Sequence, residues 1–167
     1  PGCEEQLPSA MAAIREVADR RLGLRSHLVQ LAGALALYRG TVVEMATGEG
    51  KTLTAGLIAV VWGWIGRPCH IVTVNDYLAD RDARWLEPLF KFCGVSVGRV
   101  TGEMDPQARR EEYRSDVTYT TSKEILADFL RDRLRLEALQ NASRRQIQAL
   151  SGRLQDMERG LVMRGIH

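Results

Sequence analysis

The sequence predicts an α/β fold in which helices cover both faces of a parallel β-sheet. Four runs rich in β-branched residues have the length of strands, at residues 41–46, 70–75, 95–100 and 116–121. Helix-like segments separate them, at about 50–65, 77–93 and 105–114. Strands that alternate with helices at this spacing are typical of βα units on a parallel sheet.

Helical patterns lie on either side of this alternating region. Ser9 is a candidate cap for a first helix, in which apolar residues recur every three or four positions from Met11 to Leu22. A second apolar helix is expected at about 27–37, and Gly40 is placed to end it. We therefore expect three parts: N-terminal helices at 1–40, an α/β core at 41–132, and a helical segment at 133–167.

The C-terminal third is helical in pattern from Ser122 to Leu161 and carries an apolar stripe. The stripe consists of Ile147, Leu150, Leu154, Met157 and Leu161. One apolar stripe is typical of a helix that packs on its own domain, and a partner-binding helix is the alternative.

Composition narrows the class of protein. The 167 residues fit one domain, and a formal net charge of +2 gives no argument for a nucleic-acid partner. The three cysteines and three histidines show neither disulfide nor metal-ligand spacing, so a reducing, cytoplasmic compartment is expected. No apolar run approaches the roughly 18 residues of a membrane span.

A glycine-rich stretch, "TGEGKT" at 47–52, lies between the first predicted strand and the following helix. Gly48 and Gly50 allow successive backbone N–H groups to face one point, and a helix that starts near Lys51 adds its positive end. Lys51 can then reach the β- and γ-phosphates of a nucleotide, and the Thr52 hydroxyl can join the shell of a Mg²⁺ ion. Strand, loop and helix in this order favour a phosphate-binding loop over an incidental turn.

The loop departs from the common GxxxxGKT pattern at its first position, where Met45 stands in place of glycine. From Thr47 onward it matches the TGxGKT part of the variant AxTGxGKT of helicase-like motors instead. The predicted fold class is thus a P-loop NTPase of the helicase-like, RecA type.

Gln30 lies upstream of the loop and is a candidate for reading adenine, because an amide offers a donor and an acceptor together. A lone glutamine is more often a surface or capping residue, so this assignment depends on the motifs around it.

Together these motifs resemble the first nucleotide-binding domain of the SecA family, the motor ATPases of bacterial protein export. The resemblance rests on "LGLR...VQL", "EMATGEGKTLTA", "VTVNDYLADRDA", "DVTY" and "DFLRD", covers about residues 7–132, and resumes at "LVMRGIH". The most specific element is "VTVNDYLADRD", where related RNA helicases carry a "PTREL"-like segment. "TYTTSKE", where the common family pattern is "TYGTNNE", indicates a divergent member.

The resemblance implies residue roles. The adenine-reading glutamine falls on Gln30, and the phosphate loop falls on Thr47, Gly48, Glu49, Gly50, Lys51 and Thr52, preceded by Met45. The segment of Asn75, Asp76, Tyr77, Arg81 and Asp82 is implied to relay the nucleotide state to the rest of the motor. Helix capping by Asn75 and Asp76, with a surface pair of Arg81 and Asp82, is the structural alternative.

ATP hydrolysis also needs a carboxylate pair that holds Mg²⁺ through water and polarises the attacking water. No Asp-Glu pair follows an apolar strand in this sequence. In the SecA family this strand comes just after a segment like "LVMRGIH", so we expect an incomplete domain that lacks the Walker B carboxylates. Alone, these residues are expected to bind nucleotide without turning it over.

The resemblance further implies ATP and Mg²⁺ as cofactors, with preproteins and the SecYEG channel as partners. It implies a cytoplasmic protein that associates peripherally with the anionic surface of the inner membrane, possible homodimers, and no specific nucleic acid. Two alternatives remain: a superfamily 2 nucleic-acid helicase-type motor, and a non-hydrolysing module whose helical tail at 131–160 is a docking surface.

Overall fold

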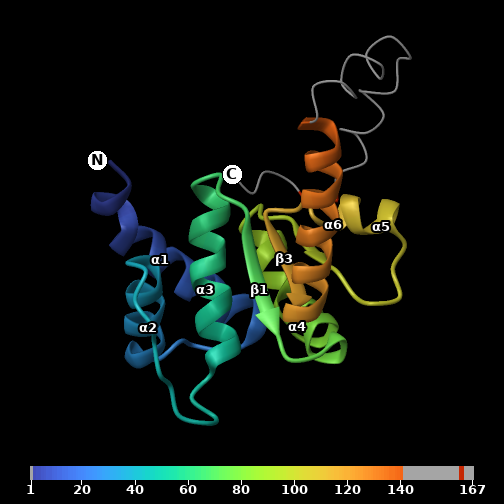
Figure 1. Ribbon diagram of the computed structural model, residues 1–167. Coiled ribbons are helices and arrows are strands. Elements are labelled where there is room, and N and C mark those ends of the chain that lie inside the picture. Colours follow the sequence, from blue (N-terminus) through green and yellow to red (C-terminus); the bar gives the residue numbers. More distant parts are fainter. Residues whose placement is uncertain (1, 141–161, 164–167) are drawn as a thin grey trace.

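A computed structural model describes residues 2–140 and 162–163 of the chain (Figure 1). The helices in this part are α1 (Gly2–Leu22), α2 (Leu28–Tyr38), α3 (Lys51–Trp64), α4 (Asp76–Phe92), α5 (Pro106–Glu112) and α6 (Ser122–Gln140). The strands are β1 (Cys69–Thr73), β2 (Val97–Arg99) and β3 (Val117–Thr121). None of the helices described is both long and apolar enough to cross a membrane.

The three strands form a parallel sheet in the order β1-β3-β2. Cys69 is paired with Val117 on one side of β3, and Val97 is paired with Val117 on the other. Every residue of β3 is buried. The predicted parallel α/β architecture is therefore confirmed, with helices on both sides of the sheet.

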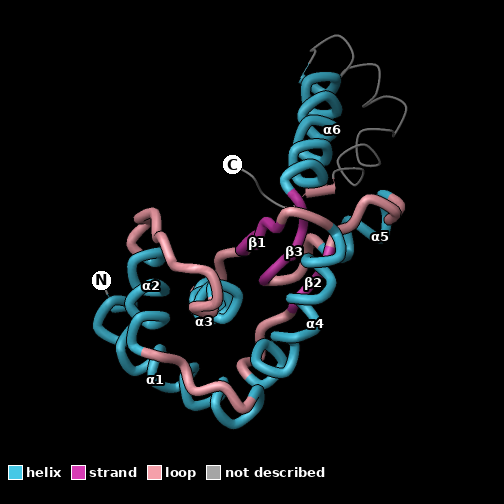
Figure 2. Tube along the Cα trace, turned by 90° about the horizontal axis from the view of Figure 1, so that it is seen from below, coloured by secondary structure: helices cyan, strands magenta, loops and turns pink. Residues whose placement is uncertain are grey.

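The helices are arranged so that α3 brings the glycine-rich loop to one end of the molecule. α4 and α6 lie on opposite sides of the sheet, and α3 lies between α2 and α4 (Figure 2). α1 packs against both α3 and α4. The loop before α3 therefore has α2 on one side and α4 on the other.

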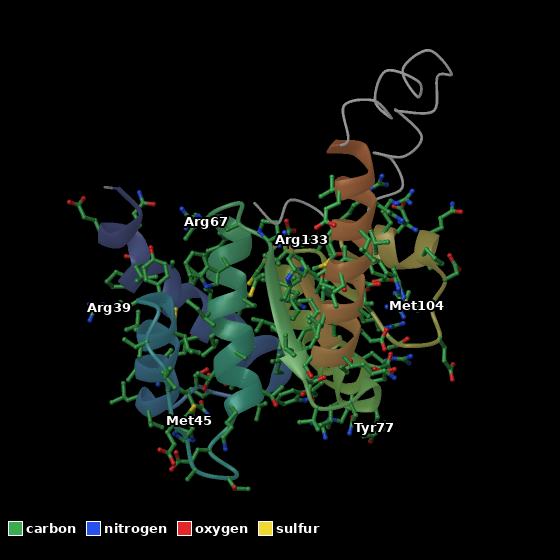
Figure 3. All side chains as sticks on the ribbon, viewed as in Figure 1. Arg39, Met45, Arg67, Tyr77, Met104 and Arg133 are labelled. Atoms are coloured by element: carbon green, nitrogen blue, oxygen red, sulfur yellow. The ribbon has the colours of Figure 1, made fainter. Side chains whose placement is uncertain are left out.

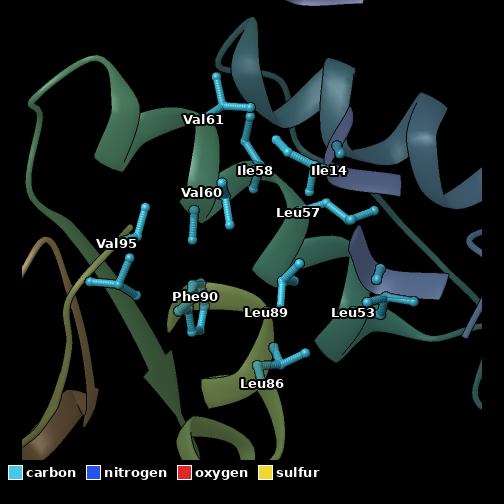
Figure 4. Close-up of a cluster of buried hydrophobic side chains, with 14 of the residues drawn as sticks. Ile14, Leu53, Leu57, Ile58, Val60, Val61, Leu86, Leu89, Phe90 and Val95 are labelled. Atoms are coloured by element: carbon cyan, nitrogen blue, oxygen red, sulfur yellow. The ribbon is translucent and has the colours of Figure 1, made fainter. Parts of the chain in front are cut away.

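A buried apolar cluster joins α1, α3 and α4 (Figure 4). Ile14, Leu57, Val60, Leu86 and Phe90 have no exposed side-chain surface in it. Each such burial contributes roughly 1.5–3 kcal/mol. This cluster holds the beginning of α3, and thus the loop, in a fixed place relative to α4.

Gly56 allows α3 and α4 to approach closely. A Cβ atom at this position would lie 2.6 Å from Cδ1 of Leu86, a distance that carbon atoms do not tolerate. The absence of a side chain thus brings the first turns of α3 next to α4.

The strand predicted at 41–46 is wrong. These residues have no regular secondary structure, none of them pairs with the sheet, and Val42 is fully exposed. A strand is stable where a neighbour accepts and donates its backbone hydrogen bonds. Residues 41–46 have no such neighbour in the described part of the chain, so their β propensity has no structural effect.

The predicted cap at Ser9 is also wrong, because α1 begins at Gly2 and passes through Pro8 and Ser9. Leu7 packs against the apolar cluster, which gives the turn before Ser9 a contact of its own. Gly40 ends α2 as expected, with a φ of 75°. Helix α6 confirms the helical pattern from Ser122 to Gln140, whereas the apolar stripe at 147–161 lies outside the described residues.

Residues Val162 and Met163 lie against α6. The carboxylate of Asp132 accepts the backbone N–H of Val162 at 2.9 Å and that of Met163 at 2.7 Å. Val162 and Met163 are buried beside Val100 and Tyr113 in a second apolar cluster. The segment that follows the undescribed residues is thereby fixed near β2 and α5.

Candidate nucleotide-binding site

Two glycines shape the loop that precedes α3. Gly48 has a φ of 89° and Gly50 a φ of 81°, in the left-handed region that favours glycine. Gly50 is the N-cap of α3, so the unpaired N–H groups of the first helical turn begin directly after it. A helix N-terminus of this kind favours a bound anion.

Lys51 and Glu49 fold back over the loop. The Lys51 ammonium donates to the carbonyl of Ala46 at 2.9 Å, and a Glu49 carboxylate oxygen accepts the Ala46 N–H at 3.3 Å. Both charged side chains thus contact the same residue at the start of the loop. A phosphate bound at the N-terminus of α3 would lie within reach of the exposed Lys51 side chain.

Met45 is buried next to α2, just before the loop (Figure 3). Its sulfur lies 3.6 Å from the position that a Cβ atom would take at Gly33. Apart from glycines, no residue of the described chain has a positive φ, so the backbone at Met45 does not require glycine. This geometry explains why the loop forms without the first glycine of the common pattern.

Gln30 joins α2 to the loop. Its amide oxygen accepts the His27 N–H at 2.9 Å, and its amide nitrogen donates to the Glu49 carbonyl at 2.9 Å. The residue is only 7% exposed, and a side chain at Gly50 would collide with it. One lone pair and one N–H of the amide remain after these two bonds.

A cavity of about 530 Å³ lies beside the loop. Its size falls within the range of small-molecule sites. The loop side of its lining consists of Gly48, Gly50, Lys51, Thr52 and Leu53. Thr47 and Glu49 belong to the loop but are not among the lining residues.

The other wall of the cavity comes from α4. It consists of Arg81, Asp82 and Trp85. Sequence patterns singled out Arg81 and Asp82 but placed neither at the phosphate loop, and Trp85 was missed. The four-residue spacing of Arg81 and Trp85, which places both on one face of a helix, was a signal for it.

The remaining residues of the "NDY" segment have structural contacts. The Asn75 side chain caps α4 by accepting the Leu78 N–H at 2.8 Å, and Asp76 accepts the Gly102 N–H at 2.8 Å. Tyr77 is exposed. The capping role considered for Asn75 is thus confirmed.

Asp82 is buried, with 8% of its surface exposed. Burial, and after it the negative charge of Asp82, raises the pKa of the Tyr119 phenol in β3. No group of three or more potential metal ligands occurs among the residues that the structure describes.

A glycine-rich loop that leads into a helix beside a parallel α/β sheet defines the class of helicase-like P-loop NTPases. A solved structure supports this class: a hypothetical ATP-dependent RNA helicase from Sulfolobus tokodaii matches with a TM-score of 0.54 and 19% identity, over 96% of this chain and 47% of that one. At this identity the likeness concerns the fold alone.

A family model described as the SecA DEAD-like domain matches residues 2–159, and the chain belongs to this family. It is similar to the protein translocase subunit SecA 2 of Chlorobium chlorochromatii, with 54% identity over 86% of this chain and 22% of that protein. The SecA 2 of Magnetococcus marinus is 44% identical over 98% of this chain and 25% of its own length. The protein translocase subunit SecA of Rippkaea orientalis is 49% identical over 78% of this chain and 14% of its own length. The chain therefore spans a quarter or less of these relatives.

Proposed function

We propose that this chain is the ATP-binding part of a protein-translocating ATPase that drives preprotein export through the SecYEG channel. The observation that carries the proposal is the glycine loop at the start of α3, open to a cavity of about 530 Å³, in a chain of the SecA family. The function of the relatives named as translocase subunits supports the transport role.

In this proposal the loop binds the phosphates of ATP. The N–H groups at the start of α3, freed by the turn at Gly48 and Gly50, cradle the phosphate oxygens. Lys51 exchanges the Ala46 carbonyl for the β- and γ-phosphates and is the residue that we assign to catalysis. Thr47, Glu49 and Met45 shape the loop around it.

Gln30 is proposed to bind the adenine ring. The lone pair and the N–H that its amide retains match the acceptor and donor on one edge of adenine. The other two hydrogen bonds of the Gln30 amide join it to His27 and Glu49. The binding of adenine to Gln30 would therefore depend on the position of the loop.

The residues present fit a Mg²⁺ ion only in part. Thr52 lines the cavity and offers one hydroxyl ligand, and ATP would provide phosphate oxygens. A bound Mg²⁺ would neutralise charge on the phosphates. The carboxylate pair that holds it through water in motors of this class, Asp-Glu after an apolar strand, has no counterpart in this sequence, and we propose that other parts of the full-length protein provide it.

The 167-residue chain is expected to bind ATP without hydrolysing it. Phosphate release by the chain, measured with excess ATP and Mg²⁺, should equal that of its Lys51→Ala variant, because no Asp-Glu pair follows an apolar strand to activate water. Turnover that depends on Lys51 would contradict this expectation and would place a complete catalytic site within these residues.

For the whole protein we propose unfolded preproteins, the SecYEG channel and anionic lipids of the inner membrane as partners, on the cytoplasmic face, with homodimers possible. No specific nucleic acid is proposed. The RNA helicase likeness rests on fold alone, so the helicase alternative has less support than the translocase relatives at 44% to 54% identity. The docking-module alternative depends on a tail that is mostly undescribed.

A further inference from the structure

The α4 wall of the cavity carries a positively charged side chain that faces the same space as Lys51. Arg81 and Lys51 come from different helices, and both line the cavity of about 530 Å³. The cavity also has the N-terminus of α3 at one side. Lys51, Arg81 and the N-terminus of α3 thus bring positive potential to one space, and the Asp82 carboxylate, which also lines it, offsets part of the charge of Arg81.

Asp82 fixes the guanidinium of Arg81. Both Nε and Nη2 of Arg81 donate to one Asp82 carboxylate oxygen, at 2.9 and 2.7 Å. The Asp82 residue is 8% exposed, whereas the Arg81 side chain is 51% exposed. The pair therefore has an anchored end and an accessible end, and Nη1 of Arg81 has no partner among the described residues. An arginine held in this way needs little further ordering to bind a ligand.

The position of α4 indicates which part of a nucleotide would meet Arg81. α2, with Gln30, and α4, with Arg81, lie on opposite sides of α3 (Figure 2). The loop and the start of α3 lie between them. A nucleotide with its adenine near Gln30 and its inner phosphates on the loop would therefore direct its terminal phosphate toward α4.

We propose that Arg81, positioned by Asp82, binds the terminal phosphate of ATP, so that α4 distinguishes ATP from ADP. This inference rests on the proposed function, because it requires a nucleotide on the loop. Arginine suits the role because its planar fork donates two parallel hydrogen bonds to phosphate oxygens. The salt bridge to Asp82 uses Nε and Nη2 and leaves Nη1 to donate to a ligand, and the Arg81 side chain lines the cavity.

The test compares a non-hydrolysable ATP analogue with ADP, both with Mg²⁺, in titrations of the 167-residue chain. Arg81→Gln should weaken binding of the ATP analogue by about tenfold, as expected for the loss of one charge-assisted contact, and ADP binding by less than about twofold. The matched control is Arg84→Gln, one turn along α4, whose exposed side chain pairs with Asp80 at 2.9 Å and does not line the cavity. It should leave both affinities unchanged.

The outcomes separate this inference from the proposed function. Equal losses for both nucleotides in Arg81→Gln, or no loss for either, would overturn the role of Arg81 while nucleotide binding itself stands. Trp85→Leu provides a second check: if it weakens both nucleotides while Arg81→Gln weakens neither, the adenine occupies this cavity and the inference is wrong. A chain that binds neither nucleotide would overturn the proposed function.

Discussion

Replacing Asp128 with alanine is expected to lower the free energy of unfolding by about 3–5 kcal/mol, the cost of leaving a buried charge without its partner. Asp128 has no exposed surface, and the side chain of Arg109 is 4% exposed. Nη1 of Arg109 donates to Asp128 at 2.9 Å, and the Tyr113 hydroxyl donates to the same oxygen at 3.1 Å. The variant removes the acceptor of both hydrogen bonds at once.

The remaining partners of Arg109 limit the loss but do not remove it. Its guanidinium also contacts Glu124 at 2.6 Å and the Met104 and Thr101 carbonyls at 3.0 and 2.8 Å. The Glu124 carboxylate would still pair with Arg109. The cluster that joins α5 to α6 would lose the carboxylate to which both Arg109 and Tyr113 donate. Arg131, bound to the other Asp128 oxygen, is exposed enough to return to water.

Urea denaturation of the variant and the parent chain measures this effect. Glu111→Ala is the control, because its bridge to Arg114 at 2.7 Å is exposed and should contribute less than about 1 kcal/mol. Equal destabilisation by the two variants would show that the buried cluster does not stabilise the fold.

Lys51→Ala is expected to weaken binding of ATP with Mg²⁺ to the chain by about 100-fold, since the ammonium should make charge-assisted hydrogen bonds to two phosphates. In the structure its contact is the Ala46 carbonyl, a bond that phosphate can replace. The fold should be unaffected, because Lys51 is exposed.

Isothermal titration of the variant and of Lys91→Ala tests the assignment. Lys91 lies in the last turn of α4, is exposed, and does not line the cavity, so its loss should change the affinity by less than about twofold. If the two variants bind ATP equally well, the loop is not the phosphate site.

The sequence was sufficient to predict the helices and the parallel sheet, because β-branched runs favour strands and glycines end helices through local backbone preferences. It failed at 41–46, where the same β-branched pattern has no strand beside it. A strand depends on a partner elsewhere in the chain, which a local pattern does not contain. The early start of α1 depends similarly on the tertiary contact of Leu7.

The loop could be predicted from consecutive residues, and the structure brings Gly48, Gly50, Lys51 and Thr52 to one cavity. The α4 wall could be predicted only in part. The spacing of Arg81 and Trp85 places both on one helix face, but the contact of this face with the loop region depends on the packing of α3 on α4. The buried partners of Arg109 were missed as well. Glu124, Asp128 and Asp132 recur every four residues, a spacing that places three carboxylates on one helix face and would have indicated a buried charge cluster.

The decisive measurement is ATP hydrolysis by the full-length protein, with and without an unfolded preprotein and SecYEG vesicles. For a protein-translocating ATPase we expect a rate that rises with preprotein and vesicles together, that Lys51→Ala abolishes, and that RNA leaves unchanged. Stimulation by RNA, with no response to preprotein and vesicles, would contradict it.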